Sequence, residues 1–344
     1  MTCLYLTTKK VALIMADKLL YGIQQVGIGV TDIVEAEKWY ARVLLANIKV
    51  LEDHHPATHM APYMGGRSRN KSAVILINKH GGGGFELWQH TEHPPQYIEK
   101  PIQRGDLGIN YITLLSCDLK EFMRHLDRLK IEHSAISQRE ISIMDPFQNI
   151  IHIKEDALLH SSAISTGVKG CTIGVSDLDT SLIFYQHFGY SLTHQSETDL
   201  TLECTLSSTI KSNGRFGAFF GHNEIVLIQR KDRNARKIFE NRYWGDPGFI
   251  HLCFDVFNLK SWVKYFSEIS PFTILSDENF RMGDAYGYWG YLEDPDGYLI
   301  EMVETHRIPI FKNLGIIINL KNKSPHKKVP KWLIQAMRLK KARH

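Results

Sequence analysis

The chain repeats one pattern four times, and this internal repeat constrains its fold more than any other feature. Residues 26–40, VGIGVTDIVEAEKWY, are similar to residues 171–185, CTIGVSDLDTSLIFY. In the same way, GINYITLLSCDL from Gly108 is similar to GFIHLCFDVFNL from Gly248. Self-similar segments indicate a supersecondary unit that has been copied along the chain. We number the units modules 1 to 4; modules 1 and 3 are alike, and so are modules 2 and 4, as expected for a duplicated two-module ancestor.

Each module begins with the pattern of a strand followed by a helix. In module 1, Val26, Ile28 and Val30 alternate with smaller residues, which is the period of a strand. Apolar residues then recur at helical spacing over residues 33–45, and Asp32 is placed to cap that helix. Apolar stretches such as AVILI and GFELW supply the later strands. Each module is therefore predicted to have the order βαβββ, and the chain to belong to the α+β class.

Three motifs resemble the vicinal oxygen chelate superfamily: the Val-x-Ile-x-Val-x-Asp openings, the aromatic-Tyr pairs on the first helices, and the ending DPDGYLIEM. That superfamily includes glyoxalase I, methylmalonyl-CoA epimerase, extradiol ring-cleaving dioxygenases, and fosfomycin or bleomycin resistance proteins. The resemblance covers roughly residues 21–305. It implies two glyoxalase-like domains with open, curved mixed sheets, at residues 21–160 and 161–310. An N-terminal extension (1–20) and a basic tail (311–344) flank them.

The resemblance also implies a metal site. In the superfamily the ion is held by the first residue of the opening strand and by an acid on the last strand of each partner module. Carried over to this sequence, these places hold Gln25 and Glu86 in module 1, and His251 and Glu301 in module 4. Modules 2 and 3 have Tyr111, His152, Gly170 and Val226 there. In glyoxalase I and its fused relatives module 1 faces module 4 and module 2 faces module 3, so one complete site and one lapsed site are expected.

The surroundings of these residues favour the metal site independently. His251 shares a strand face with Cys253 and Asp255, whereas Glu86 and Glu301 lie in otherwise apolar strands, where a carboxylate must be paired or metal-bound. The alternative for each residue alone is an inward-facing polar group satisfied by a hydrogen bond. One amide oxygen, two carboxylates and one imidazole suit an octahedral divalent ion, and Mn²⁺, Fe²⁺, Co²⁺, Ni²⁺, Mg²⁺ and Zn²⁺ all remain open.

Such a site favours a metal-dependent lyase, isomerase or epimerase that chelates a small oxygenated substrate and stabilises an enediolate. Glu301 is the first candidate for the catalytic base and Glu86 the second. The alternative from another class is a resistance-type binding protein without turnover, and a third is a structural paralogue with no site. Five residues are predicted to line the pocket: Trp88, Tyr63, Tyr243, Trp244 and Arg242. Aromatic residues of this kind are also typical of a hydrophobic core.

Two activities of the superfamily are disfavoured by single positions. A ring-cleaving dioxygenase needs a histidine where module 3 has Gly170, and a glycine has no ligand atom in its side chain. Glutathione-dependent glyoxalases carry an arginine, an asparagine and a second arginine where this chain has Gly29, His90 and Pro247.

Composition predicts a globular cytoplasmic protein. With 344 residues, of which 43% are hydrophobic, the chain can bury large cores, but its longest apolar runs are too short to cross a membrane. The five cysteines have no CxxC spacing and are predicted to be reduced thiols. Residues 311–344 hold ten Lys and Arg and no acids, and Trp332 and Met337 lie on one face of a predicted short helix. Because no nucleic-acid motif accompanies this tail, we expect it to dock on its own domain or on a second subunit of a homodimer.

Overall fold

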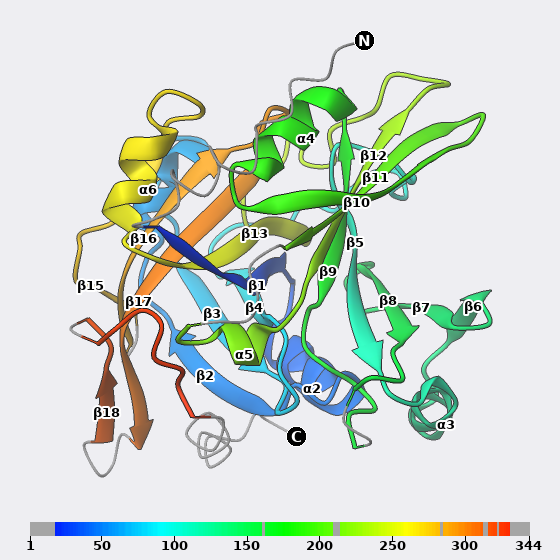
Figure 1. Cartoon of the computed structure of the whole chain (residues 1–344), viewed down its shortest axis with the longest axis horizontal. Coiled ribbons are helices and arrows are strands. Elements are labelled where there is room, and N and C mark those ends of the chain that lie inside the picture. The colour runs from blue at the N-terminus through cyan, green and yellow to red at the C-terminus, as the bar shows by residue number, and fades with distance from the viewer. Residues whose placement is uncertain are drawn as a thin grey trace.

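The computed structural model describes residues 18–159, 162–208, 214–282, 285–311, 316–321 and 323–330. Within these residues all four predicted modules are present, and each has the predicted order of a strand, a helix and further strands. The prediction of an α+β fold with two curved mixed sheets is confirmed (Figure 1).

Modules 1 and 2 form the first half of the chain. Module 1 contains β1 (Leu19–Gly29), α2 (Ile33–Val43), β2 (Ile48–Asp53), the 3-10 helix η1 (Thr58–Tyr63), β3 (Lys71–Ile77) and β4 (Gly84–His90). Module 2 contains β5 (Gly108–Ser116), α3 (Leu119–Leu129), β6 (His133–Ser137), β7 (Glu140–Met144) and β8 (Ile150–Glu155).

Modules 3 and 4 repeat this order. Module 3 contains β9 (Gly170–Val175), α4 (Leu178–Gln186), β10 (Tyr190–Glu197), β11 (Thr201–Ser208), the short helix α5 (Gly217–Phe220) and β12 (Glu224–Arg230). Module 4 contains β13 (Gly248–Phe257), α6 (Leu259–Phe266), β14 (Ile274–Leu275), β15 (Phe280–Met282), β16 (Ala285–Glu293) and β17 (Leu299–Phe311), and is followed by β18 (Ile316–Asn319).

Each sheet combines one module from each half of the chain. The larger sheet joins modules 1 and 4 in the order β14-β16-β17-β13-β1-β4-β3-β2, with β15 and β18 paired to β16 and β17. The smaller sheet joins modules 2 and 3 in the order β10-β11-β12-β9-β5-β8-β7-β6. The antiparallel pairs β1–β13 and β5–β9 form the two junctions. The expected facing of module 1 with module 4 is thus observed, whereas a domain boundary near residue 160 stays a prediction.

The helices begin where the sequence places their caps. The Asp32 carboxylate accepts hydrogen bonds from the backbone N–H groups of Val34 and Glu35, both at 2.9 Å. Asp118 and Asp177 cap α3 and α4 in the same way. An acid at this position satisfies N–H groups that have no partner within the helix, so the helix start is fixed locally by the sequence.

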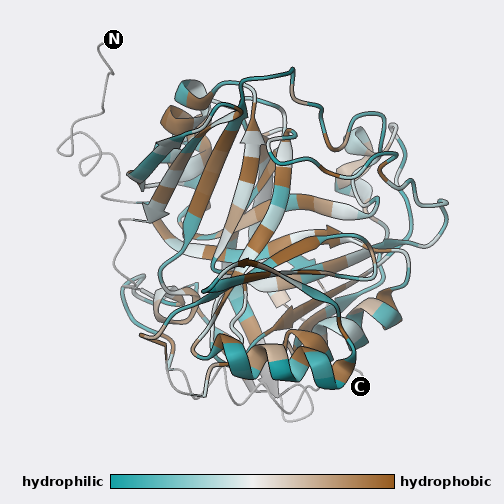
Figure 2. Ribbon diagram, turned by 90° about the vertical axis from the view of Figure 1, so that its right-hand side faces the viewer, coloured by the Kyte–Doolittle hydropathy of each residue, from teal (hydrophilic) through white to brown (hydrophobic). Residues whose placement is uncertain are grey.

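Modules adjacent in sequence are tied together through the core. The Tyr40 hydroxyl donates a 2.7 Å hydrogen bond to Asp145, joining module 1 to module 2. At the equivalent place the Tyr185 hydroxyl donates to Asp294 at 3.2 Å, joining module 3 to module 4. All four side chains are buried in or beside a core built from both sheets and their helices, and Figure 2 shows hydrophobic residues concentrated along the strands.

The ends of the chain are described in part. β18 and the residues up to 330 belong to the predicted basic tail, and β18 pairs with β17 at the edge of the larger sheet. The helix predicted after Pro330 lies outside the described residues, as do residues 1–17 of the predicted extension. None of the described helices has the length and apolar character that crossing a membrane requires.

Candidate metal centre

Strand register brings the four predicted ligands onto one face of the larger sheet. Gly27 of β1 is paired with His251 of β13 on one side and with Glu86 of β4 on the other. Cys253 of β13 is likewise paired with Gln25 of β1 and with Glu301 of β17. Side chains two residues apart on a strand share a face. The register therefore converges these side chains at the junction between modules 1 and 4.

The four polar groups are within contact distance of one another. The Gln25 amide Nε2 donates to Glu86 Oε2 at 2.9 Å and to Glu301 Oε2 at 3.4 Å. The His251 Nε2 atom lies 3.1 Å from Glu86 Oε2 and 3.2 Å from Glu301 Oε2. All four side chains are buried, and His251 is completely inaccessible to solvent. Gln25 and Glu301 are 276 positions apart in the chain, so only the fold brings them together.

The chemistry of this donor set fits a divalent cation. Among the described residues, Glu86, His251 and Glu301 form a group whose ligand atoms all lie within 4.8 Å of one another. Although its Nε2 lies near two carboxylates, neither ring nitrogen of His251 makes a hydrogen bond of acceptable geometry. Two carboxylates facing one imidazole form an acid-rich group in a buried place, and buried negative charge is costly unless it is neutralised. A cation held by Glu86, His251 and Glu301 would compensate this charge, and Gln25 would add its amide oxygen if its amide group turned over, since Nε2 now faces the carboxylates.

The pKa of His251 reflects the same cluster. Burial alone lowers this pKa, but the carboxylates of Glu301 and Glu86 more than offset burial and raise it to about 9. A proton therefore occupies the imidazole at neutral pH when no metal is bound. Because a histidine must be neutral to ligate a metal, proton and cation compete for this side chain.

Gly27 is needed for His251 to occupy this position. A β-carbon at residue 27 would lie 2.2 Å from Cε1 and 2.4 Å from Nδ1 of the imidazole. The ring thus fills the volume that any other residue on β1 would use for its side chain. At the equivalent place module 3 has Thr172, which pairs with Tyr111 of module 2.

Aromatic and apolar side chains surround the cluster. The Trp244 ring lies parallel to the His251 ring with centroids 5.9 Å apart, and Tyr291 approaches it edge-on at 5.4 Å. Burial raises the pKa of the Tyr291 hydroxyl well above its ordinary value, and so it does for the Cys253 thiol. Both groups stay protonated, so these two neighbours of the cluster are uncharged.

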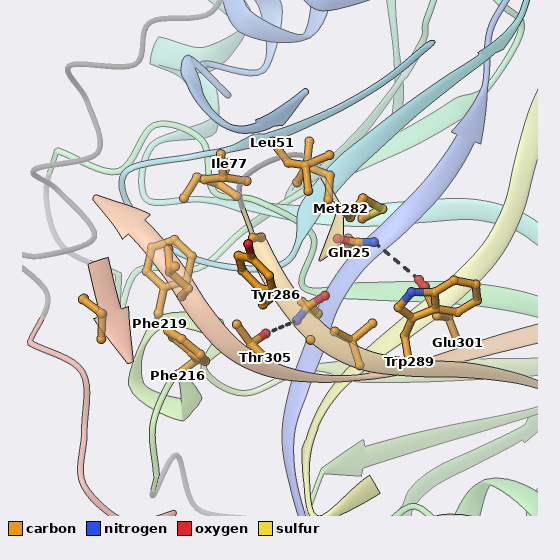
Figure 3. Close-up of a pocket in the computed structure, with 18 of the residues that line it drawn as sticks. Gln25, Leu51, Ile77, Phe216, Phe219, Met282, Tyr286, Trp289, Glu301 and Thr305 are labelled. Carbon is orange, nitrogen blue, oxygen red and sulfur yellow. Dashed lines mark hydrogen bonds between the residues drawn. The ribbon is translucent and has the colours of Figure 1, made fainter. Parts of the chain in front are cut away.

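A cavity of about 180 Å³ opens beside the cluster. Gln25 and Glu301 line one end of it with Trp289, and Phe216 and Phe219 line the other end (Figure 3). A second cavity of about 70 Å³ is lined by Glu86, Trp88, Trp244 and Tyr291. Glu301 is exposed to both cavities, so it lies where any ligand of the cluster would be bound.

The residues predicted to bind substrate divide into two groups. Trp88 and Trp244 line the smaller cavity, with ring centroids 4.2 Å apart. Tyr63, Tyr243 and Arg242 line neither cavity. The Tyr63 hydroxyl donates to Glu293 and lies 2.7 Å from the Thr273 hydroxyl, and Tyr243 packs under Arg69. The Arg242 guanidinium donates to the backbone carbonyls of Gln96, Ile238 and Pro247, so its charge supports a loop instead of facing a ligand.

The equivalent place in the smaller sheet is filled by side chains. The Tyr111 ring stacks on His152 with centroids 3.8 Å apart, and His152 Nδ1 lies 2.7 Å from Glu140. A β-carbon on Gly170 would lie 2.7 Å from the carbonyl oxygen of Glu224. Of the residues that the structure describes, no third metal-ligating side chain joins His152 and Glu140 here. A lapsed second site stays a prediction.

Several residues of the larger cavity were not predicted from the sequence. They come from α5 of module 3 and from the tail, and they are Phe216, Phe219, Phe220, Ile318 and Val329. The only signals for them are the apolar cluster FGAFF outside any repeat and the run III within an otherwise basic tail.

Comparisons with known proteins agree with the fold and the repeat. Residues 167–302 match the family described as the Glyoxalase/Bleomycin resistance protein/Dioxygenase superfamily. A candidate dioxygenase from Bacillus subtilis is similar in structure, with a TM-score of 0.58 at 14% identity over 83% of this chain and 85% of that one. Glyoxalase I from Zea mays, as a V278E mutant, gives a TM-score of 0.58 at 11% identity over 86% and 96% of the two chains. No curated protein matches the sequence. The family match thus covers modules 3 and 4, and the chain as a whole shares its fold with glyoxalase I and the Bacillus subtilis protein.

Proposed function

We propose that the protein is a divalent-metal-dependent lyase, isomerase or epimerase whose site lies between modules 1 and 4. The observation that carries the proposal is the buried cluster of Gln25, Glu86, His251 and Glu301, in which two carboxylates face an imidazole with no hydrogen-bond partner of acceptable geometry. When bound there, a divalent ion supplies Lewis-acid stabilisation of negative charge on two neighbouring substrate oxygens. The residues of the cluster then have distinct parts in the chemistry.

Glu301 is the candidate for the base. It lines both cavities, whereas Glu86 lines only the smaller one. A base must reach the carbon that loses its proton, so the carboxylate that borders both spaces is better placed. The Gln25 amide orients Glu301 and Glu86 by donating a hydrogen bond to each carboxylate. The His251 ring packs against both carboxylates and shields them from solvent.

Proton exchange with solvent tests this proposal without knowledge of the product. Removal of a proton next to a carbonyl, followed by its return in D₂O, exchanges that hydrogen for deuterium in recovered substrate. We expect the metal-loaded protein to catalyse exchange in a panel of α-hydroxycarbonyl compounds, measured by ¹H NMR. Glu301→Gln should abolish the exchange and His152→Ala, in the lapsed site, should not. Exchange at the wild-type rate in Glu301→Gln would overturn the assignment of the base.

A second candidate function is ligand binding without turnover, as in resistance proteins of the superfamily. The apolar lining of the cavity favours it, since burial of apolar surface gives affinity even without chemistry. Tight binding of a panel compound with no deuterium incorporation in any metal form would favour this second function over catalysis.

A further inference from the structure

We infer that the site takes a substrate in which two neighbouring oxygens are attached to an uncharged, apolar body about the size of a substituted benzene ring. This inference rests on the proposed function, because the oxygens are assigned to the metal end of the cavity. Its evidence is the chemical character and the size of the 180 Å³ cavity next to Gln25 and Glu301.

The charged part of the cavity wall lies at the metal cluster. Among the described residues that line it, Glu301 is the only one with a formal charge, and no lysine, arginine or histidine is present. A substrate body bearing carboxylate or phosphate groups would therefore lose its hydration and gain no compensating cation. This excludes peptide-thiol conjugates and nucleotide-bearing thioesters from the interior of the cavity.

Gln24 and Thr305, two other polar residues of the cavity wall, already have hydrogen-bond partners within the protein. The Gln24 amide Nε2 donates to Asp255 Oδ1 at 2.7 Å and to Thr305 Oγ1 at 3.3 Å. The Thr305 hydroxyl also lies 3.3 Å from Asp255 Oδ1. Because these groups are satisfied within the protein, they do not require a polar substrate body.

The far end of the cavity is lined by apolar side chains from two other parts of the chain. Phe216 and Phe219 come from the α5 region, and Ile318 and Val329 come from the tail. Arg215 holds the tail in place, since its guanidinium donates to the carbonyls of Leu320 and Lys323 at 2.8 and 3.0 Å. This end of the cavity therefore offers an apolar surface to the substrate body.

The cavity volume sets the size of the substrate body. An apolar cavity of about 150 Å³ is known to accept benzene, and this cavity measures about 180 Å³. A phenyl ring with a short substituent, or a branched aliphatic group of similar volume, fills such a space.

Simple hydroxamates test the inference, because they chelate through two neighbouring oxygens and differ only in their body. We expect metal-loaded full-length protein to bind benzohydroxamate at least about tenfold more tightly than acetohydroxamate, measured by calorimetry, since a phenyl group buries more apolar area than a methyl group. A 4-carboxylate on the ring should cancel this gain. Equal affinities for the phenyl and methyl compounds, or tighter binding of the carboxylated one, would overturn the inference.

A matched pair of variants tests whether the preference for the phenyl compound arises in this cavity. Ile318 lines the cavity, whereas the neighbouring Ile317 is 52% exposed on the same edge strand. Ile318→Asp should reduce the phenyl preference to about one, and Ile317→Asp should retain it, with metal affinity unchanged in both. A phenyl preference that survives in Ile318→Asp contradicts binding in this cavity.

Failure of the proposed metal-dependent function can be distinguished from failure of the inference about the substrate body. If the protein binds no metal, neither hydroxamate will show metal-dependent binding. Toluene is then titrated into metal-free protein and followed by NMR. Toluene binding that Ile318→Asp abolishes and Ile317→Asp retains supports the apolar substrate body although the metal proposal fails. Absence of toluene binding overturns the inference as well.

Discussion

The imidazole of His251 lies directly against the backbone of Gly27, and a β-carbon on Gly27 would come within 2.2 Å of it. The two residues are paired across the antiparallel β1–β13 junction. The backbone of module 1 thereby sets the position of a candidate ligand from module 4. The junction between the modules is therefore part of the site itself.

Gly27→Ala should displace the His251 ring and weaken metal binding by at least about tenfold, an effect comparable to the loss of an outer-shell contact. Overpacking should also lower the free energy of unfolding by about 1–3 kcal/mol. Calorimetric titration with Mn²⁺ and urea unfolding measure the two effects. The control is Thr172→Ala at the equivalent position of module 3, which should leave metal affinity unchanged.

The metal-free protein should lose stability between about pH 6.5 and pH 9 because of His251. Its pKa in the fold, about 9, lies above the value of about 6.5 expected in the unfolded chain. The protonated ring thus stabilises the fold fully below about pH 6.5, and this contribution, on the order of 3 kcal/mol, disappears as the pH rises through 9. Metal affinity should rise over the same window. Urea unfolding with chelator present should show the slope in the wild type and a much smaller slope in His251→Gln.

Asp255 should give the protein a second pH dependence at lower pH. Burial raises the pKa of this carboxyl to about 7, although hydrogen bonds from Gln24 and Thr305 oppose the effect. The unfolded chain ionises at about pH 3.9, so the fold is progressively destabilised as the pH rises from about 4 through 7. Asp255→Asn should flatten this part of the stability profile. An unchanged slope in the variant would show that Asp255 is ionised in the fold throughout.

Asp106 should change the stability with pH in the direction opposite to Asp255. Burial tends to raise its pKa, but hydrogen bonds from the Gln103 backbone, Arg233 and Arg236 lower it below the ordinary value. Its contribution to stability is therefore present above about pH 4 and is lost as the pH falls through the folded pKa. Asp106→Asn should lower stability at pH 7, whereas Asp255→Asn should not.

Arg215→Ala should release the tail from the larger cavity. The side chain is 2% exposed and donates to two backbone carbonyls of the segment that follows β18. Leaving these carbonyls without a donor should lower the free energy of unfolding by about 2–3 kcal/mol. Hydrogen exchange followed by mass spectrometry should show faster exchange in residues 316–330. The exposed Arg307, changed to alanine, serves as control and should leave that exchange rate unchanged.

The pairing of module 1 with module 4 was predicted from the resemblance to glyoxalase I, and the observed strand register explains how the four candidate ligands lie close together. Once Gln25 and His251 are placed at equivalent positions of opening strands, antiparallel pairing of these strands brings them together. The end of the cavity formed by Phe219 and Ile318 was not predictable in this way. Neither residue belongs to a repeated segment, and an apolar residue outside a repeat carries no information about the surface on which it packs.

The predicted pocket aromatics show the same limit. Trp88 follows Glu86 by two residues on β4, so the two side chains share a face and both line the smaller cavity. Tyr63 and Tyr243 lie in connections between strands, where the sequence gives no direction for a side chain. Their hydroxyl and ring contacts are made with other loops instead of the cavity.

The metal content of the purified full-length protein tests the central claim most directly. The protein is loaded with Mn²⁺, excess metal is removed, and the bound metal is measured by elemental mass spectrometry. We predict one ion per chain in the wild type and in His152→Ala. Glu301→Gln and His251→Ala should each retain far less than one ion while keeping the wild-type circular dichroism spectrum. A wild type without bound ion, or folded variants that retain a full equivalent, would contradict a metal centre between modules 1 and 4.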